Sequence, residues 1–272
     1  MSPSRQRAND RRAIAGKSRG LAWHPEPMEW RHDDGVRWLE AELPGARAMF
    51  TTRVGGVSRG PYDSLNLGIL TGDDRERVRD NRHRLSAALE LDPGSVLIGR
   101  QVHGADVATH DAAPAPNAFA DPGPDLPEVD GQATTRPGLA PLVMVADCLP
   151  VALAGPRGVA MVHCGWRGLA AGIVERGAIA VGASASAIGP GIGPCCYEVG
   201  DEVLAAFEGL GEGISEGRML DLREVARRLL ERANIDSVTT SELCTRCNPE
   251  LFYSHRRDGP RTGRQAGLVW IE

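Results

Sequence analysis

Two apolar stretches separated by a short turn stand out in the hydrophobic pattern of this chain. Residues 141–154 and 158–162 are mostly apolar, whereas residues 155–158 between them combine two glycines, a proline and an arginine. Glycine and proline in so short a connection are typical of a turn between two strands. The pattern therefore predicts a β-hairpin.

The register of this hairpin brings two reactive side chains together. A tight turn places Ala154 opposite Val159. The same register carries Pro150 to a position opposite His163, and Cys148 then lies about 7 Å further along its strand at ~3.3 Å per residue. A thiol and an imidazole at one end of a hairpin are typical of a metal site. Two core residues can share the same geometry, so a metal site needs a third ligand.

Outside the hairpin, short apolar segments and amphipathic segments alternate without a strict βαβ rhythm. Strands are expected at residues 48–52, 95–98, 105–109, 186–188, 238–239 and 268–271. Helices are expected at residues 73–91, 167–181, 202–207 and 221–233. This mixture predicts a mixed α/β (α+β) fold, a layered sandwich of mixed sheet with helices packed outside, in a single domain.

The composition changes along the chain and suggests its organisation. Residues 1–20 are basic and lack the apolar segment of a secretory signal, which indicates a disordered tail. Residues 21–47 are expected to be an irregular lead-in, anchored by tryptophans, to a main domain at residues 48–272. Residues 111–130 are expected to be a long surface loop of that domain. No run of about 18 apolar residues occurs, so no membrane span is expected.

Charge and cysteine content limit the possible partners. The net charge of −5 and the sequence pI of about 5.8 do not indicate the basic surface that nucleic-acid binding requires. Six cysteines in 272 residues, two of them adjacent, do not resemble a disulfide framework. Reduced thiols and a cytoplasmic location fit better. No feature of the sequence indicates an obligate protein partner.

Three residues combine into a candidate metal site. His103 follows a short apolar segment and would add a second imidazole to Cys148 and His163. Three protein ligands and an open position describe a catalytic zinc site, in which the pKa of bound water falls to about 7. Two histidines and one cysteine also form a blue-copper site, but the spacings of 45 and 15 residues differ from the single short loop that usually supplies that set.

The other cysteines leave several interpretations open. The Cys244-x-x-Cys247 motif has three interpretations: half of a structural zinc site, a redox pair, or two unconnected thiols. No second such motif occurs in the sequence. The adjacent Cys195 and Cys196 could instead supply the nucleophile of a cysteine hydrolase, with His255 as the base.

Arginines in glycine- or serine-rich loops point to an anionic ligand. A guanidinium in such a loop can bind phosphate or carboxylate through two parallel hydrogen bonds. The arginines with this setting are Arg53, Arg167, Arg256, Arg257 and Arg264. A surface ion pair is the alternative for each arginine alone. Convergence of several of them near a metal would indicate an anionic substrate.

A series of motifs in one order resembles a known family. The matching segments are residues 51–68, 78–82, 101–104, 130–131, 146–151, 163–168, 188–199 and 252–265. Over about residues 49–270 the chain is similar to the YfiH/laccase-domain family, the purine nucleoside phosphorylases once labelled polyphenol oxidases. Only the second cysteine of the Cys244-x-x-Cys247 motif lies outside the family pattern.

The resemblance implies a zinc enzyme whose substrates are purine nucleosides and inorganic phosphate. The family's metal ligands match His103, Cys148 and His163. Members phosphorolyse adenosine, inosine, guanosine and methylthioadenosine, and deaminate adenosine. The expected substrate or phosphate contacts are Arg53, Asn66, Arg167 and Arg256. Asp147 or His255 is the expected catalytic acid.

Three other functions compete with this one. A copper-dependent polyphenol oxidase (laccase) would bind copper in place of zinc and oxidise phenols with oxygen. A cysteine hydrolase using Cys195 or Cys196 would keep its activity in the presence of a chelator. A binding protein would hold nucleosides without turnover.

Overall fold

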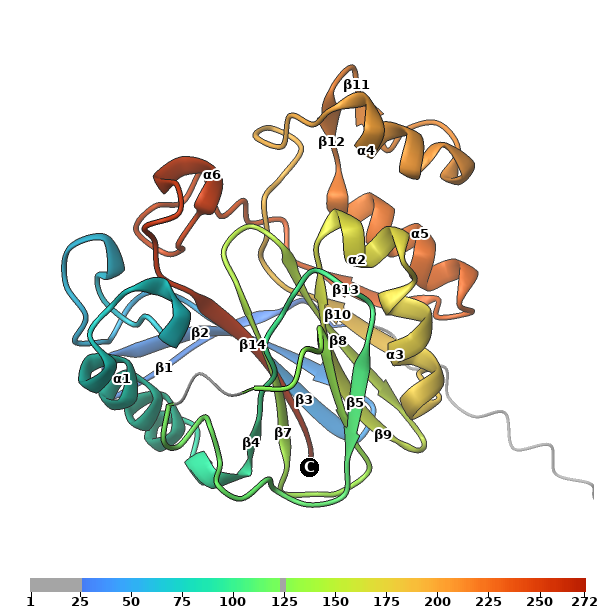
Figure 1. Ribbon diagram of the computed structural model, residues 1–272. Helices are drawn as coiled ribbons and strands as arrows, with labels where there is room; N and C mark the ends of the chain where they lie inside the picture. Colours follow the sequence, from blue (N-terminus) through green and yellow to red (C-terminus); the bar gives the residue numbers. More distant parts are fainter. Residues whose placement is uncertain (1–25, 123–125) are drawn as a thin grey trace, which may run out of the picture.

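Two six-stranded sheets packed face to face form the centre of the molecule (Figure 1). The computed structural model describes residues 26–122 and 126–272. The first sheet runs in the order β1 (Glu29–Asp33), β2 (Val36–Leu43), β3 (Ala46–Thr51), β14 (Gln265–Ile271), β7 (Ala140–Val145) and β4 (Val96–Leu97). The second runs in the order β13 (Ser237–Thr240), β10 (Ala185–Ile188), β8 (Leu149–Gly155), β9 (Gly158–Cys164), β6 (Gly131–Thr134) and β5 (Val107–His110). A separate pair joins β11 (Ser215–Glu216) to β12 (Met219–Leu220).

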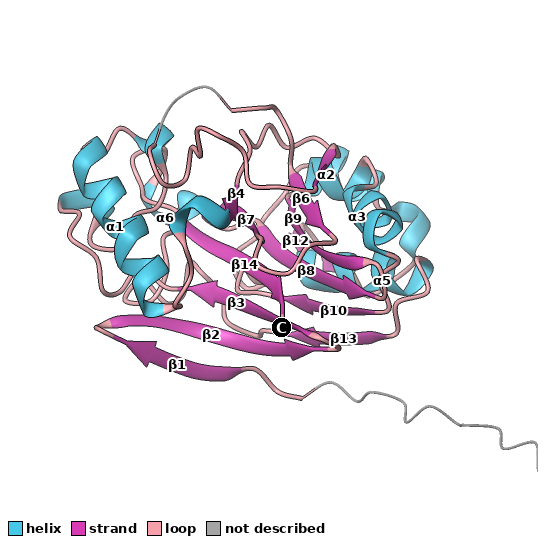
Figure 2. Cartoon of the chain, turned by 90° about the horizontal axis from the view of Figure 1, so that it is seen from below, coloured by secondary structure: helices cyan, strands magenta, loops and turns pink. Residues whose placement is uncertain are grey.

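Helices cover the outer faces of both sheets (Figure 2). The α-helices are α1 (Arg75–Ala88), α2 (Trp166–Ala170), α3 (Ile173–Val181), α4 (Asp201–Ala206), α5 (Leu222–Arg232) and α6 (His255–Asp258). Short 3₁₀ turns occupy Gly60–Tyr62, Ile69–Thr71, Pro93–Ser95 and Glu208–Leu210. Helix α1 packs outside the first sheet, and α2, α3 and α5 pack outside the second. The expected single-domain α/β sandwich is therefore confirmed, with two mixed sheets at its centre.

The space between the sheets is filled by small and medium apolar side chains. Phe50 and Val143 from the first sheet meet Ala152 and Met161 from the second, and all four are at most 1% exposed. The sheets approach closely at Gly267, where a Cβ atom would lie 2.6 Å from Cβ of Pro150. Burial of each larger side chain contributes roughly 1.5–3 kcal/mol, so this layer fixes how the sheets stack.

The predicted hairpin and its register are confirmed. Strands β8 and β9 pair antiparallel with Ala154 opposite Val159 and Pro150 opposite His163. Strand β8 begins at Leu149, so Cys148 lies immediately before it.

The predicted helices form, with one difference. Asp74 caps α1 by accepting hydrogen bonds from two backbone amides of the first turn, and Asp221 caps α5 in the same way. The helix expected at residues 167–181 is divided into α2 and α3 at Gly172, whose φ of 86° is a left-handed conformation that a helix cannot contain.

The structure differs from the sequence expectation at residues 26–47. This part of the expected lead-in forms β1 and β2, which extend the first sheet. In β2, Val36 and Trp38 are buried while Arg37 is exposed, so the segment has the period of a half-buried strand. Residues 1–25, which include the expected tail, lie outside the described residues. None of the described helices is long and apolar enough to cross a membrane.

Asn81 on α1 organises the loop between β3 and α1. Its side-chain oxygen accepts a hydrogen bond from the amide of Val57 at 2.8 Å. Its amide nitrogen donates to the Ser58 hydroxyl and to the carbonyl oxygens of Ser64 and Asn66. Asn81 is fully buried, so water cannot replace these partners.

We expect Asn81→Ala to lower the free energy of unfolding by about 2–4 kcal/mol, because it leaves several buried polar groups unpaired. Urea unfolding monitored by circular dichroism measures the change. His83→Ala, at an exposed position on the same helix, is the control and should change stability by less than about 0.5 kcal/mol. Equal midpoints for the two variants would contradict this role of Asn81.

Candidate metal centre and pocket

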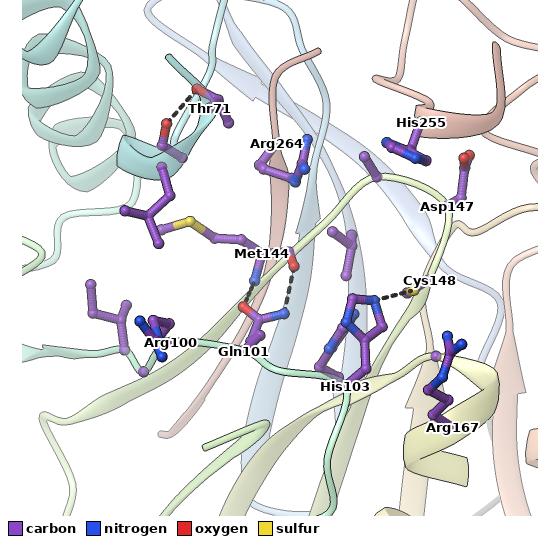
Figure 3. Close-up of a pocket in the computed structure, with 18 of the residues that line it drawn as sticks. Thr71, Arg100, Gln101, His103, Met144, Asp147, Cys148, Arg167, His255 and Arg264 are labelled. Carbon is purple, nitrogen blue, oxygen red and sulfur yellow. Dashed lines mark hydrogen bonds between the residues drawn. The ribbon is translucent and has the colours of Figure 1, made fainter. Parts of the chain in front are cut away.

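The metal-site residues come from three segments that line one cavity, where Figure 3 shows His103 beside Cys148. The chain crosses from the first sheet to the second after β7, and this crossing carries Cys148. It also crosses after β4, and that crossing carries His103. His163 lies near the end of β9. His103 and Asp147 have φ values of 62° and 95°, and such left-handed residues are uncommon except where a site requires them.

The spacing of the three donor atoms suits a bound metal ion. The donor atoms of His103, Cys148 and His163 all lie within 4.8 Å of one another. Cys148 Sγ is 3.9 Å from His103 Nε2, and the two imidazole rings have centroids 4.9 Å apart. In a tetrahedral site with metal–nitrogen bonds of about 2.0 Å and metal–sulfur bonds of about 2.3 Å, ligand atoms lie roughly 3.3–3.8 Å apart. Only small side-chain movements separate this arrangement from coordination.

Asp130 holds two of the three candidate ligands in place. Its Oδ1 accepts a hydrogen bond from His163 Nδ1 at 2.8 Å, which leaves the other ring nitrogen for the metal. The same carboxylate accepts hydrogen bonds from the backbone amides of Val102, His103 and Gly104 at 2.8–3.0 Å. Burial opposes ionisation, but the hydrogen bonds from His163, Gly104 and Val102 lower the pKa of Asp130. A carboxylate behind a ligating histidine is a regular feature of metal sites.

The groups around Cys148 favour the form of cysteine that binds metals. Burial would by itself raise the pKa of Cys148, but the charge of His163 and hydrogen bonds with both histidines lower it to about 6. Burial would lower the pKa of His163, but the charge of Cys148 and the hydrogen bond to Asp130 raise it to about 9. A thiolate beside an imidazolium is therefore the stable pair, and a cation can replace the proton.

A cavity of about 430 Å³ opens directly over the three candidate ligands. This volume falls within the roughly 300–1,000 Å³ of small-molecule sites. Trp166, Ile192 and Tyr197 contribute to its walls. The arginines that line it are Arg82, Arg100, Arg167, Arg256 and Arg264. A cavity with apolar surfaces and several cations suits a ligand that has both a flat ring and an anionic group.

The structure brings both expected catalytic residues to this cavity. Asp147 and His255 line it beside Cys148 (Figure 3). Both oxygens of Asp147 are engaged, because Oδ1 accepts from the Thr245 hydroxyl and Oδ2 from the Arg256 amide, each at 2.6 Å. His255 is exposed at the start of α6. Of the two, His255 is the one whose side chain forms no hydrogen bond with the described residues.

The four expected anion contacts fall into two pairs. Arg167 and Arg256 line the cavity, and their guanidinium groups lie 4.4 Å and 5.2 Å from the ring centroids of Trp166 and Tyr197. Arg53 and Asn66 are not among the cavity residues.

The second pair binds other parts of the protein. Arg53 donates to the carbonyl oxygens of Asp63 and Pro249. Asn66 is fully buried, and its side chain bonds Gly68 and Arg264 among others. The structure thus does not place Arg53 and Asn66 with the other expected contacts.

The geometry does not favour a cysteine nucleophile. Cys195 Sγ and Cys196 Sγ lie 3.6 and 3.4 Å from Cys247 Sγ, and within the described residues no histidine is hydrogen-bonded to them. Unless a cation is bound, burial and the neighbouring thiols raise the pKa of Cys195, which opposes the free thiolate that a nucleophile requires. A nucleophile would need an adjacent base.

Sequence reasoning missed two residues that shape the centre. Asp130 belongs to a motif of the family resemblance, and only its position beneath His163 shows that the carboxylate supports the ligands. Gln101 ties the crossing after β4 to strand β7, because its side-chain amide exchanges two hydrogen bonds with the backbone of Met144 at 2.7 and 2.8 Å. In the sequence, the signal for both residues was their place in motifs of the family resemblance, at residues 101–104 and 130–131.

Comparisons with known proteins agree with the fold and with the resemblance. Residues 47–272 match the family described as "Multi-copper polyphenol oxidoreductase laccase". The chain is 37% identical over 256 residues to the purine nucleoside phosphorylase YlmD of Geobacillus stearothermophilus, covering 85% of this chain and 93% of that one. It is 37% identical over 240 residues to the purine nucleoside phosphorylase YfiH of Escherichia coli, covering 84% and 94%. The crystal structure of the Geobacillus YlmD superposes with a TM-score of 0.81 at 34% identity, covering 90% of this chain and all of that one.

Proposed function

The chain belongs to the family described as multi-copper polyphenol oxidoreductase laccase, with relatives named purine nucleoside phosphorylase, and we propose that it is a zinc-dependent enzyme of that activity. Its substrates would be adenosine, inosine, guanosine or methylthioadenosine with phosphate, and it would also deaminate adenosine. The observation that carries the proposal is a three-donor metal centre that opens into a cavity lined by arginines.

The donor set supports zinc as the metal. His103, Cys148 and His163 would hold it, and three protein ligands leave one position for water or substrate, as in catalytic zinc sites. When bound, zinc supplies a Lewis acid that lowers the pKa of water and polarises a substrate atom. Asp130 keeps His163 in the tautomer that binds a metal.

The cavity side chains suit phosphorolysis. Phosphate would attack the ribose C1′ while the bond from that carbon to the base breaks, giving the free base and ribose 1-phosphate. Arg167 and Arg256 would orient the phosphate through paired hydrogen bonds, because both residues line the cavity. His255 would protonate the departing base, and Asp147 would fix the start of α6 through the Arg256 amide. Trp166 and Tyr197 offer flat surfaces beside a purine.

Copper is the rival metal, because the family description names it and two histidines with a cysteine also bind copper. A multicopper oxidase needs several copper sites rich in histidine. Among the described residues, only one metal-ligand cluster contains histidine. Copper without zinc in the purified untagged protein, together with oxygen-dependent oxidation of phenols, would favour the oxidase.

The test is incubation of the zinc-loaded protein with adenosine or inosine, with and without phosphate. Chromatography should show adenine or hypoxanthine and ribose 1-phosphate only when phosphate is present. Conversion of adenosine to inosine without phosphate would show the deaminase activity. If the zinc-loaded protein forms none of these products, the proposed function is wrong.

Arg167→Met should raise the KM for phosphate by about 10- to 100-fold, because a hydrogen bond to a charged group contributes roughly 1.5–3 kcal/mol. Initial rates at varied phosphate and saturating inosine measure the change. Arg176→Met is the matched control, since this arginine pairs with Asp106 on the surface and is not a cavity residue. An unchanged KM in Arg167→Met would remove Arg167 from phosphate binding.

A further inference from the structure

Four cysteines from two distant segments converge on one point. Cys195 and Cys196 lie in the loop after β10, and Cys244 and Cys247 lie in the segment between β13 and α6. Their four sulfur atoms all lie within 4.8 Å of one another. None of these cysteines forms a disulfide.

The sulfur atoms have the spacing of a tetrahedral thiolate site. The sulfur of Cys195 lies 3.6 Å from those of Cys196 and Cys247, and the latter two lie 3.4 Å apart. Zinc–sulfur bonds of about 2.3 Å place the corners of a tetrahedron roughly 3.8 Å apart. The observed distances are close to this value, and sulfur atoms so near to each other leave room for a single ion at their centre.

The backbone around the cluster is arranged to support a negatively charged sulfur. The amide of Gly193 donates a hydrogen bond to Cys244 Sγ at 3.2 Å, and the amides of Arg246 and Cys247 donate to the same sulfur. The guanidinium of Arg246 contacts Cys196. Four thiolates around one divalent ion carry a net negative charge. Amide donors and a nearby cation stabilise that charge.

We propose that Cys195, Cys196, Cys244 and Cys247 bind a second zinc ion, in a structural site separate from the His103–Cys148–His163 centre. Four thiolates without an open position are typical of a structural zinc site. Soft sulfur ligands in a tetrahedral arrangement select zinc over magnesium or calcium.

The proposed zinc ion would connect two segments that lead to the cavity. The loop after β10 carries Ile192 and Tyr197 to the cavity, and the segment after β13 leads to His255 and Arg256 beside them. The Thr245 amide donates to the Gly191 carbonyl at 3.0 Å, and the Arg256 guanidinium donates to the Glu198 carbonyl at 2.8 Å. A zinc ion bound by both segments would hold these two neighbouring parts of the cavity wall together.

Metal analysis of untagged protein grown with added zinc tests the proposal. We expect two zinc ions per chain in the unaltered protein, one in Cys148→Ala, and one in the double variant Cys195→Ser/Cys247→Ser. The two substituted positions of the double variant are exposed, so the fold should tolerate them. Cys164→Ala is the matched control, because this buried cysteine belongs to neither cluster, and it should retain two ions.

Cobalt substitution gives a readout that does not depend on activity. In Cys148→Ala, cobalt should produce the intense near-ultraviolet sulfur-to-metal absorption and the visible bands of a tetrahedral thiolate site. Adding the two serine substitutions should abolish these bands. Folded Cys148→Ala protein that contains no zinc and gives no such spectrum would overturn the proposal, as would iron or copper in place of zinc. Either result would leave the nucleoside assay and the first centre unaffected.

Discussion

Cys148→Ala should lose the metal of the His–Cys–His centre and retain less than about 1% of the phosphorylase kcat/KM. Loss of a residue that only supports a metal ligand costs about 10- to 100-fold, so loss of a ligand should exceed this range. Cys148 is also the donor whose pKa the two histidines lower to about 6. In the variant, the two histidines have no thiolate beside them. Zinc content per chain and initial rates with inosine and phosphate measure both effects.

Cys164→Ala separates the role of the ligand from that of a buried cysteine. Cys164 follows His163 in β9, but its side chain packs in the hydrophobic core against the helices. This control should lose at most about 1 kcal/mol of stability and should keep its zinc and its activity. Full activity of a Cys148→Ala protein that lacks metal at this centre would show that the reaction does not use the centre.

Asp130→Asn should weaken zinc binding at the same centre by about 10- to 100-fold. The asparagine has one acceptor oxygen and two N–H donors where the carboxylate accepts four hydrogen bonds. Its amide group would therefore face backbone donors, and either the loop carrying His103 or the ring of His163 would lose its partner. Competition with a chelator of known affinity measures the change, and circular dichroism verifies the fold.

The control for this variant is Asp106→Asn. Asp106 forms an exposed ion pair with Arg176, and surface pairs contribute about 0–1 kcal/mol. Its zinc affinity should equal that of the unaltered protein. Equal zinc affinity in Asp130→Asn would mean that the metal-binding geometry does not depend on the carboxylate.

The two proposed zinc sites differ in their donor atoms and in their surroundings. The first centre has three donors, a cavity above them and cationic side chains around it, as a catalytic site requires. The second has four sulfur donors and lies where two loops meet. Zinc lost from the second site should therefore change the arrangement of the cavity walls, whereas zinc lost from the first should remove the chemistry.

The sequence by itself determined the features that depend on neighbours along the chain. The apolar runs and the Gly-Pro turn specified the β8–β9 hairpin and its register, because so tight a connection leaves one pairing. Aspartates before amphipathic segments specified the starts of α1 and α5. The motifs also identified the family and the three candidate metal ligands.

Only the tertiary structure decided which distant residues share a site. It placed Asp130 under His163, and it separated Arg167 and Arg256 from Arg53 and Asn66, which the resemblance had grouped as substrate or phosphate contacts.

The cysteine cluster shows the physical reason most clearly. Cys196 and Cys247 are separated by 51 residues, and neither segment has a complete metal motif of its own. Their meeting depends on how β10 and β13 pair in the second sheet, with the bridge between Gly191 and Cys244 continuing that pairing. Local patterns fix the conformation of each segment, but contacts between segments depend on the packing of the whole sandwich.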